Sequence, residues 1–140
     1  MIEFTVPGEP RGKARPRVVR TRAGRSMSYT PDRTVAYEEL VRQRFRQQWP
    51  KEELPFPDKQ PVCVFIKAHF GIPKNTSKRT RNGMEDGSVR PTKKPDVDNI
   101  VKIVLDALNG LAWHDDAQVT FLAVSKEYTG KEPFVAVTLN

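Results

Sequence analysis

The stretch that decides the fold is residues 97–111, which read VDNIVKIVLDALNGL and follow directly after Pro95-Asp96. Its apolar residues recur at intervals of three and four, the spacing of one buried helix face. Asn109-Gly110 is a typical helix stop, because glycine readily adopts the left-handed backbone that ends a helix. The pattern predicts an amphipathic helix over about residues 98–109, with Asp98 as a favoured N-cap.

Working outward, residues 62–70 (VCVFIKAHF) alternate between two faces in the way of a half-buried strand. A proline-flanked apolar stripe predicts a second helix over about residues 31–49, and three more segments are predicted strands: 2–6, 117–128 and 134–139. The glycine- and proline-rich segments 11–30 and 71–95 are predicted to be loops. The sequence thus predicts one α/β (α+β) domain over residues 1–140, a small mixed β-sheet with two main helices in the order β-α-β-α-β-β.

The composition is typical of one globular domain, with 37% hydrophobic and 29% charged residues among 140. The sequence holds no run of about 18 apolar residues, so it predicts no membrane span. The first residues lack the basic and apolar regions of a secretory signal. The single cysteine, Cys63, cannot form an internal disulfide, and we therefore expect a cytoplasmic protein.

The net charge of +7 is unevenly distributed. Residues 1–30 and residues 74–94 each carry a net +5, whereas residues 95–116 carry a net −4. A charge run is often no more than a solvated surface. Two basic segments on either side of an acidic cluster favour a polyanionic partner instead, with nucleic acid first among the candidates. We expect phosphate contacts mainly from basic residues of these segments: Arg11, Lys13, Arg15, Arg17, Lys93 and Lys94.

The acidic cluster consists of Asp96 and Asp98 at the start of the predicted helix and of Asp115-Asp116 after it. If the segment before the helix is extended, the side chains of Asp96 and Asp98 point the same way. Asp115 and Asp116 are adjacent in an extended segment and face opposite sides, so we expect only one of them to lie near Asp96 and Asp98. Carboxylates alone suit Mg²⁺, with Mn²⁺ as a possible substitute. Zinc is disfavoured, because the cysteine and the two histidines lack ligand spacing.

Structural interpretations compete with functional ones at several polar residues. Asp98 could act only as a helix cap, and Asp106 is interpreted as part of the solvent face. Lys102 stands one turn beyond Asp98, where it could stabilise negative charge that develops during phosphodiester hydrolysis. Tyr29, which lies among arginines, could be buried or could stack on unpaired bases.

Three segments together resemble the signature of the RusA family of Holliday junction resolvases: residues 96–102 (DVDNIVK), 106–110 (DALNG) and 113–119 (WHDDAQV). The basic stretch 11–17 (RGKARPR) is similar to the start of phage and prophage members. The resemblance covers nearly the whole chain, although the first basic loop and the 74–95 loop are longer here.

This resemblance implies a magnesium-dependent endonuclease that cuts four-way DNA junctions as a homodimer, in recombination and repair. It implies that Asp96, Asp98 and Asp116 bind metal, that Asp115 is an accessory acid and that Lys102 is the catalytic lysine. Asn99 and Lys126 match further positions of the family and are expected to contact DNA. Two alternatives stay open: a non-catalytic DNA-binding module, and a nuclease for other branched DNA or for RNA.

Overall fold

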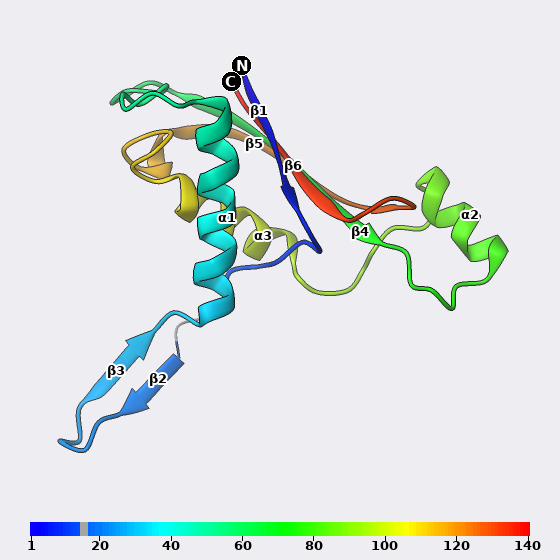
Figure 1. Cartoon of the computed structure of the whole chain (residues 1–140), viewed down its shortest axis with the longest axis horizontal. Helices are drawn as coiled ribbons and strands as arrows, with labels where there is room; N and C mark the ends of the chain where they lie inside the picture. The colour runs from blue at the N-terminus through cyan, green and yellow to red at the C-terminus, as the bar shows by residue number, and fades with distance from the viewer. Residues whose placement is uncertain (15–16) are drawn as a thin grey trace.

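The computed structural model describes residues 1–14 and 17–140 and arranges them around one four-stranded sheet (Figure 1). The predicted mixed α/β class and the predicted main elements are confirmed. The sheet strands are β1 (Ile2–Pro7), β4 (Val62–Gly71), β5 (Val119–Thr129) and β6 (Phe134–Leu139). The two main helices are α1 (Asp32–Gln48) and α3 (Val97–Leu108).

The sheet has the strand order β1-β6-β4-β5. β6 pairs antiparallel with both β1 and β4, and β5 pairs parallel with β4 at the edge. The register aligns Phe4 with Val137 and Val137 with Ile66, and all three side chains are buried. Because residues opposite each other share a face, the alternating pattern places one continuous apolar face across β1, β6 and β4.

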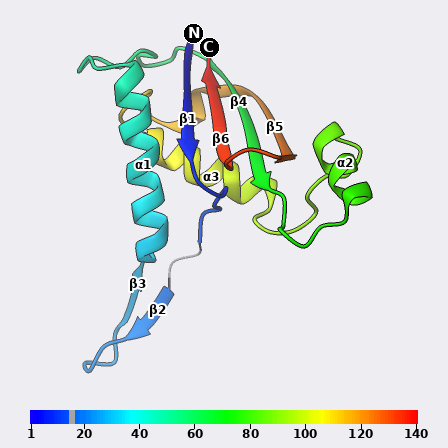
Figure 2. The ribbon, with the colours of Figure 1, turned by 45° about the vertical axis from the view of Figure 1, so that its right-hand side comes forward.

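Helices α1 and α3 cover this face (Figure 2). Phe45 of α1 meets Phe4 of β1 edge to face, with ring centroids 6.0 Å apart. α3 buries its apolar stripe, Ile100, Ile103, Val104, Ala107 and Leu108. Trp113 is fully buried after the helix, and its indole N–H donates to Asn109 Oδ1 at 2.7 Å. Because the apolar stripe of α3 packs against the sheet, the polar side of the helix faces outward.

The opposite face of the sheet exposes aromatic side chains. Phe65 of β4 and Phe121 of β5 retain 40% and 50% of their accessible surface, and their ring centroids lie 5.5 Å apart. Phe121 is therefore not part of the hydrophobic core. Phe121 pairs with Cys63 in the parallel register, and both residues lie on the face of the sheet that points away from the two helices.

Both predicted loops contain regular structure. Within 11–30, the antiparallel strands β2 (Arg17–Arg20) and β3 (Ser26–Tyr29) form a hairpin that extends away from the sheet (Figure 1). Within 71–95, α2 (Lys78–Asp86) begins after the N-cap Ser77 and ends at Gly87, whose φ is +88°. Neither element has buried residues among those described, so the sequence shows no regular spacing of apolar residues that would predict them. Across the described residues, no helix is both long and apolar enough to cross a membrane.

Candidate active site

The candidate site begins where α3 starts. Asp96 occupies the N-cap position with an extended backbone (φ −72°, ψ 154°), and Asp98 lies in the first turn. The prediction that Asp98 caps the helix is therefore wrong, because a cap residue needs the non-helical backbone that Asp96 has. Asp96 makes no capping hydrogen bond within the described structure, and both side chains are exposed. Two carboxylates thus stand open to solvent at one helix end.

The second pair of acids lies just before β5. Asp116 belongs to a short 3-10 turn, η1 (Asp116–Gln118), so the strand starts two residues later than predicted. Asp115 is exposed and Asp116 is half-buried. The pKa of Lys102 is raised first by a hydrogen bond from its ammonium to Asp106, and the charge of Asp116 adds to this rise. Asp116 therefore lies near enough for its charge to act on Lys102, on the polar side of α3.

A chain of charges links α3 to the rest of the domain. Lys102 Nζ lies 3.1 Å from Asp106 Oδ1, and Lys13 Nζ lies 3.3 Å from Asp106 Oδ2. Lys13 Nζ also lies 2.5 Å from Oε1 of Glu38, a buried residue of α1. Asp106 is only 20% exposed in its side chain, which corrects its interpretation as a solvent-face residue. Lys13 therefore ties its own segment to both main helices.

Two carboxylates hold the ammonium of Lys13 within the protein. Burial works against its charge, but the hydrogen bond and charge of Glu38, and then those of Asp106, raise the pKa of Lys13 above its usual value. Lys13 consequently stays protonated at neutral pH. Its backbone N–H also donates to the carbonyl oxygen of Asn99 at 2.9 Å. The adjacent Gly12 allows this approach, since a Cβ there would lie 2.8 Å from Pro95 Cβ.

We expect Lys13→Met to lower the free energy of unfolding by about 2 kcal/mol, because it leaves poorly solvated carboxylates without their partner. Urea unfolding of the variant measures this loss. Lys74→Met, which removes an exposed lysine, is the matched control and should change stability by less than about 0.5 kcal/mol. A Lys13→Met protein that is as stable as wild type but binds DNA more weakly would show that Lys13 serves as a DNA contact and not as a structural link.

The segment that leads into Asp96 is fastened to β5 by Lys126. Its ammonium donates to the backbone carbonyl of Lys93 and lies over the ring of Phe70, 5.4 Å from the centroid. Lys93 itself lies over the same ring at 5.6 Å. The family resemblance predicts that Lys126 contacts DNA, and the structure shows that its ammonium binds the backbone just before the acidic start of α3.

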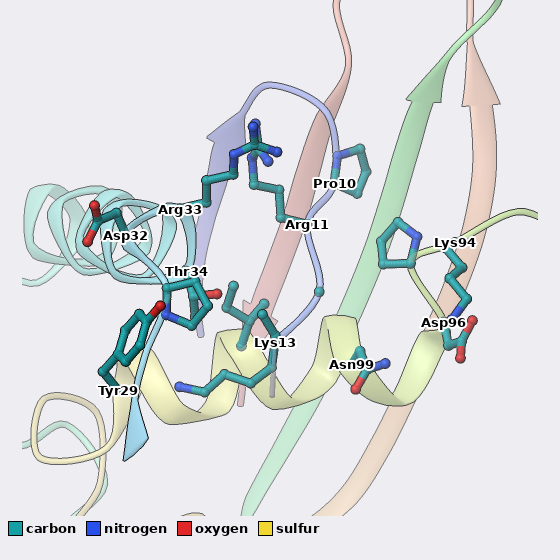
Figure 3. A pocket seen from close by; sticks show the side chains of 15 residues that line it. Pro10, Arg11, Lys13, Tyr29, Asp32, Arg33, Thr34, Lys94, Asp96 and Asn99 are labelled. Atoms are coloured by element: carbon teal, nitrogen blue, oxygen red, sulfur yellow. The ribbon is translucent and has the colours of Figure 1, made fainter. Parts of the chain in front are cut away.

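A pocket of about 840 Å³ opens beside this helix start (Figure 3). Three segments form it: residues 10–14, the junction of β3 with α1, and residues 94–103. Asp96 and Lys94 lie together at one end in Figure 3, and Tyr29 lies at the other. Arg11 and Arg33 also line it. The pocket thus joins one candidate metal ligand to a basic wall and an aromatic side chain.

The comparison with known proteins agrees with this arrangement. The family described as Endodeoxyribonuclease RusA matches residues 7–140. The chain belongs to the RusA family. It is also 39% identical over 140 residues to "Uncharacterized protein YqaN" of Bacillus subtilis (strain 168), an alignment that covers 99% of this chain and 94% of that protein. Membership in the RusA family implies endodeoxyribonuclease activity.

In this RusA family member, the residues predicted to contact DNA fall into three groups. Arg11, Lys94 and Asn99 line the pocket. Lys13, Lys93 and Lys126 are engaged in the contacts described above. Arg15 lies outside the described residues, and of Arg17 only the backbone pairing in β2 is described.

Sequence reasoning missed several residues that shape this RusA site. Asp106 and Glu38 anchor Lys13, and Gln118 holds the turn that carries Asp116. The Gln118 side chain accepts from the N–H of His114 (3.0 Å) and donates to the carbonyl oxygens of Phe56 (3.3 Å), Pro57 (3.0 Å) and Gln60 (3.1 Å). One signal was available, because a glutamate at position 38 shares the inner side of α1 with Val41 and Phe45. Such a buried acid requires a basic partner.

Proposed function

We propose that this protein is a magnesium-dependent, structure-selective endodeoxyribonuclease that resolves four-way DNA junctions in recombination and repair. The proposal rests above all on the RusA family match across residues 7–140. The exposed carboxylates at the start of α3, with Lys102 one turn further on, agree with it. Their basic surroundings suit a phosphodiester substrate.

The carboxylates fit a magnesium ion by their chemistry. Across the described residues, no group of three His, Cys, Asp or Glu side chains is placed so that it could hold a metal ion. The predicted convergence of Asp96, Asp98 and Asp116 is therefore not seen, and their roles as ligands stay proposals. Mg²⁺ commonly binds through one or two carboxylates and completes its coordination with water and substrate phosphate. Asp96 and Asp98 could hold an ion in that way, with Asp115 and Asp116 as further oxygen donors from the neighbouring turn.

The chain's own residues then have separable tasks. When bound, magnesium would supply an activated water and neutralise charge on the scissile phosphate. Lys102, protonated and 59% exposed, can place its ammonium against the charge that builds on the phosphate oxygens. Arg11 and Lys94, in the wall of the pocket, can position the DNA backbone.

Cleavage of a synthetic four-way junction tests the proposal. The purified protein is incubated with a mobile and a fixed junction, with and without Mg²⁺, and the cut sites are mapped on all four strands. We expect paired cuts near the branch point that require Mg²⁺ or Mn²⁺. A flap, a fork, a linear duplex and an RNA junction at the same concentration serve as competing substrates.

The open alternatives predict different results in the same assay. A non-catalytic binding module would bind the junction without cutting it under any metal condition. A nuclease of other specificity would cut the flap, the fork or the RNA faster than the DNA junction. Either result would overturn the proposal.

We further propose that two copies associate through the sheet face that α1 and α3 leave uncovered. A symmetric junction presents two equivalent strands, and two sites related by a two-fold axis match this symmetry. The exposed aromatic pair Phe65 and Phe121 supplies an apolar centre for a self-complementary contact. Lys67 and Glu3, which are exposed and alternate to the same face, could form its polar rim.

Light scattering should give about 32 kDa at micromolar concentration, twice the 16.0 kDa of one chain. Phe121→Lys should shift the protein to the monomer, because a charge would be buried at the centre of the contact. The control is Val18→Lys, at a residue of the β2–β3 hairpin that is 69% exposed, and it should leave the mass unchanged. Full cleavage activity from a protein of 16.0 kDa would refute the dimer.

A further inference from the structure

The pocket beside Asp96 has the size and the lining of a nucleotide site. Its volume of about 840 Å³ falls within the range of roughly 300–1,000 Å³ that is typical of small-molecule sites. A duplex cannot enter such a space, but one nucleotide that has left the helix can. The walls include apolar rings and side chains, Pro10, Pro31, Pro95 and Ile103, which suit the flat surface of a base.

Tyr29 supplies the surface on which a base can stack. It is the last residue of β3, it retains 46% of its accessible surface, and it lines the pocket at the end opposite Asp96 (Figure 3). A half-exposed aromatic side chain among basic residues is the usual platform for an unpaired base. The hairpin therefore delivers an aromatic ring to the pocket.

The charges of the lining suit the phosphate of the same nucleotide. Arg11, Arg33 and Lys94 are exposed cations of the wall, and the charge of Lys13 is compensated by Glu38 and Asp106. Two acids, Asp32 and Asp96, also line the pocket. Asp96 is one of the proposed magnesium ligands, so its repulsion toward phosphate would fall once the ion is bound.

We propose that this pocket binds one unpaired nucleotide of the branched DNA, with its base on Tyr29 and its phosphate on Arg11 and Arg33. The inference rests on the proposed function, since it takes branched DNA as the substrate. It adds a site that selects for branch points, where bases have lost stacking partners and are cheapest to extrude. The presence of Asp96 and Asn99 in the same wall places this nucleotide beside the candidate cleavage site.

Binding measured without divalent metal tests the site independently of cleavage. Fluorescence anisotropy in EDTA gives the affinity of each variant for a four-way junction and for a linear duplex at one salt concentration. We expect Tyr29→Ala to weaken junction binding by about 10-fold, the usual order for loss of one base-stacking contact. Tyr29→Phe keeps the ring and should bind like wild type. The control Met27→Ala alters a side chain of the same strand that is 58% exposed and is not part of the pocket lining, and it should also bind like wild type.

A junction labelled with 2-aminopurine locates the nucleotide. The label is moved through the positions around the branch, and its emission is recorded with each protein. We expect one label position whose emission changes when wild type, Tyr29→Phe or Met27→Ala binds. The emission at this position should not change when Tyr29→Ala binds. Arg33→Gln should weaken junction binding. Because it leaves the ring of Tyr29 in place, the emission change should still be detectable at a saturating concentration of protein.

Three results would overturn the inference: junction binding by Tyr29→Ala within twofold of wild type, equal losses on junction and duplex, or an emission change that survives in Tyr29→Ala. Failure of the proposed function looks different. A wild-type protein that shows the emission change but cuts no junction with magnesium would keep the nucleotide site and reject the resolvase.

Discussion

We expect Asp98→Asn to cleave a four-way junction on the order of 100-fold or more slowly than wild type, the size of effect seen when one group that stabilises a transition state is removed. Asparagine preserves the shape of the side chain and removes its charge. If Asp98 helps to hold the catalytic cation, that charge is essential. If it serves only the helix, the exchange changes little, because Asp98 lies in the first turn and not at the cap.

The stability of the same variant separates these roles. Loss of a carboxylate in the first turn costs about 0.3–1 kcal/mol of favourable interaction with the helix dipole. Relief of repulsion from Asp96, two residues away, works in the opposite direction. We therefore expect a melting temperature close to that of wild type without metal, and a smaller gain than wild type on addition of Mg²⁺.

Asp58→Asn is the matched control for both measurements. It makes the same change of charge at an exposed aspartate of the segment between α1 and β4. Its cleavage rate and its response to magnesium should follow wild type. Cleavage by Asp98→Asn at the rate of the Asp58→Asn protein would remove Asp98 from the metal site.

The sequence was sufficient to predict the elements whose apolar residues recur regularly because one of their faces packs against the core. α3 shows its three-and-four spacing because it packs on β5 and α1, and β4 alternates because only one of its faces is covered. The β2–β3 hairpin and α2 lie outside this core and show no buried residues among those described. Their formation depends on local turn geometry, such as the positive φ of Gly24 and Gly87, which a search for hydrophobic periods cannot detect.

The same limit explains the candidate site. Asp96, Asp98 and Lys102 lie within seven residues, so their motif could be found in the sequence. The contact of Lys13 with Asp106 joins residues that are far apart in the chain, and no spacing rule predicts it. The sequence therefore indicated Lys13 as a DNA contact, whereas the fold places it between two carboxylates.

The other large effect is expected at Lys102. We expect Lys102→Met to slow junction cleavage by about 100- to 1,000-fold, because the variant loses the one positive charge on the exposed side of α3 that can stabilise the developing negative charge. Junction affinity in EDTA should fall far less, since a single phosphate contact is one among many. The fold should survive, because the Lys102 side chain is 59% exposed and its i,i+4 pair with Asp106 is worth only a few tenths of a kcal/mol.

Asp106→Asn distinguishes a catalytic Lys102 from one that serves only this pair. The exchange removes the negative charge that lies 3.1 Å from Lys102 Nζ, and it leaves the ammonium of Lys102 in place. If Lys102 served only to form the ion pair with Asp106, Lys102→Met and Asp106→Asn would have equally small effects on cleavage. If Lys102 acts on the phosphate, Asp106→Asn should keep cleavage within about 10-fold of wild type at equal folded concentration, while Lys102→Met loses far more. Single-turnover cleavage rates at saturating junction decide the matter, and a Lys102→Met protein that cleaves as fast as Asp106→Asn would exclude Lys102 from the chemistry.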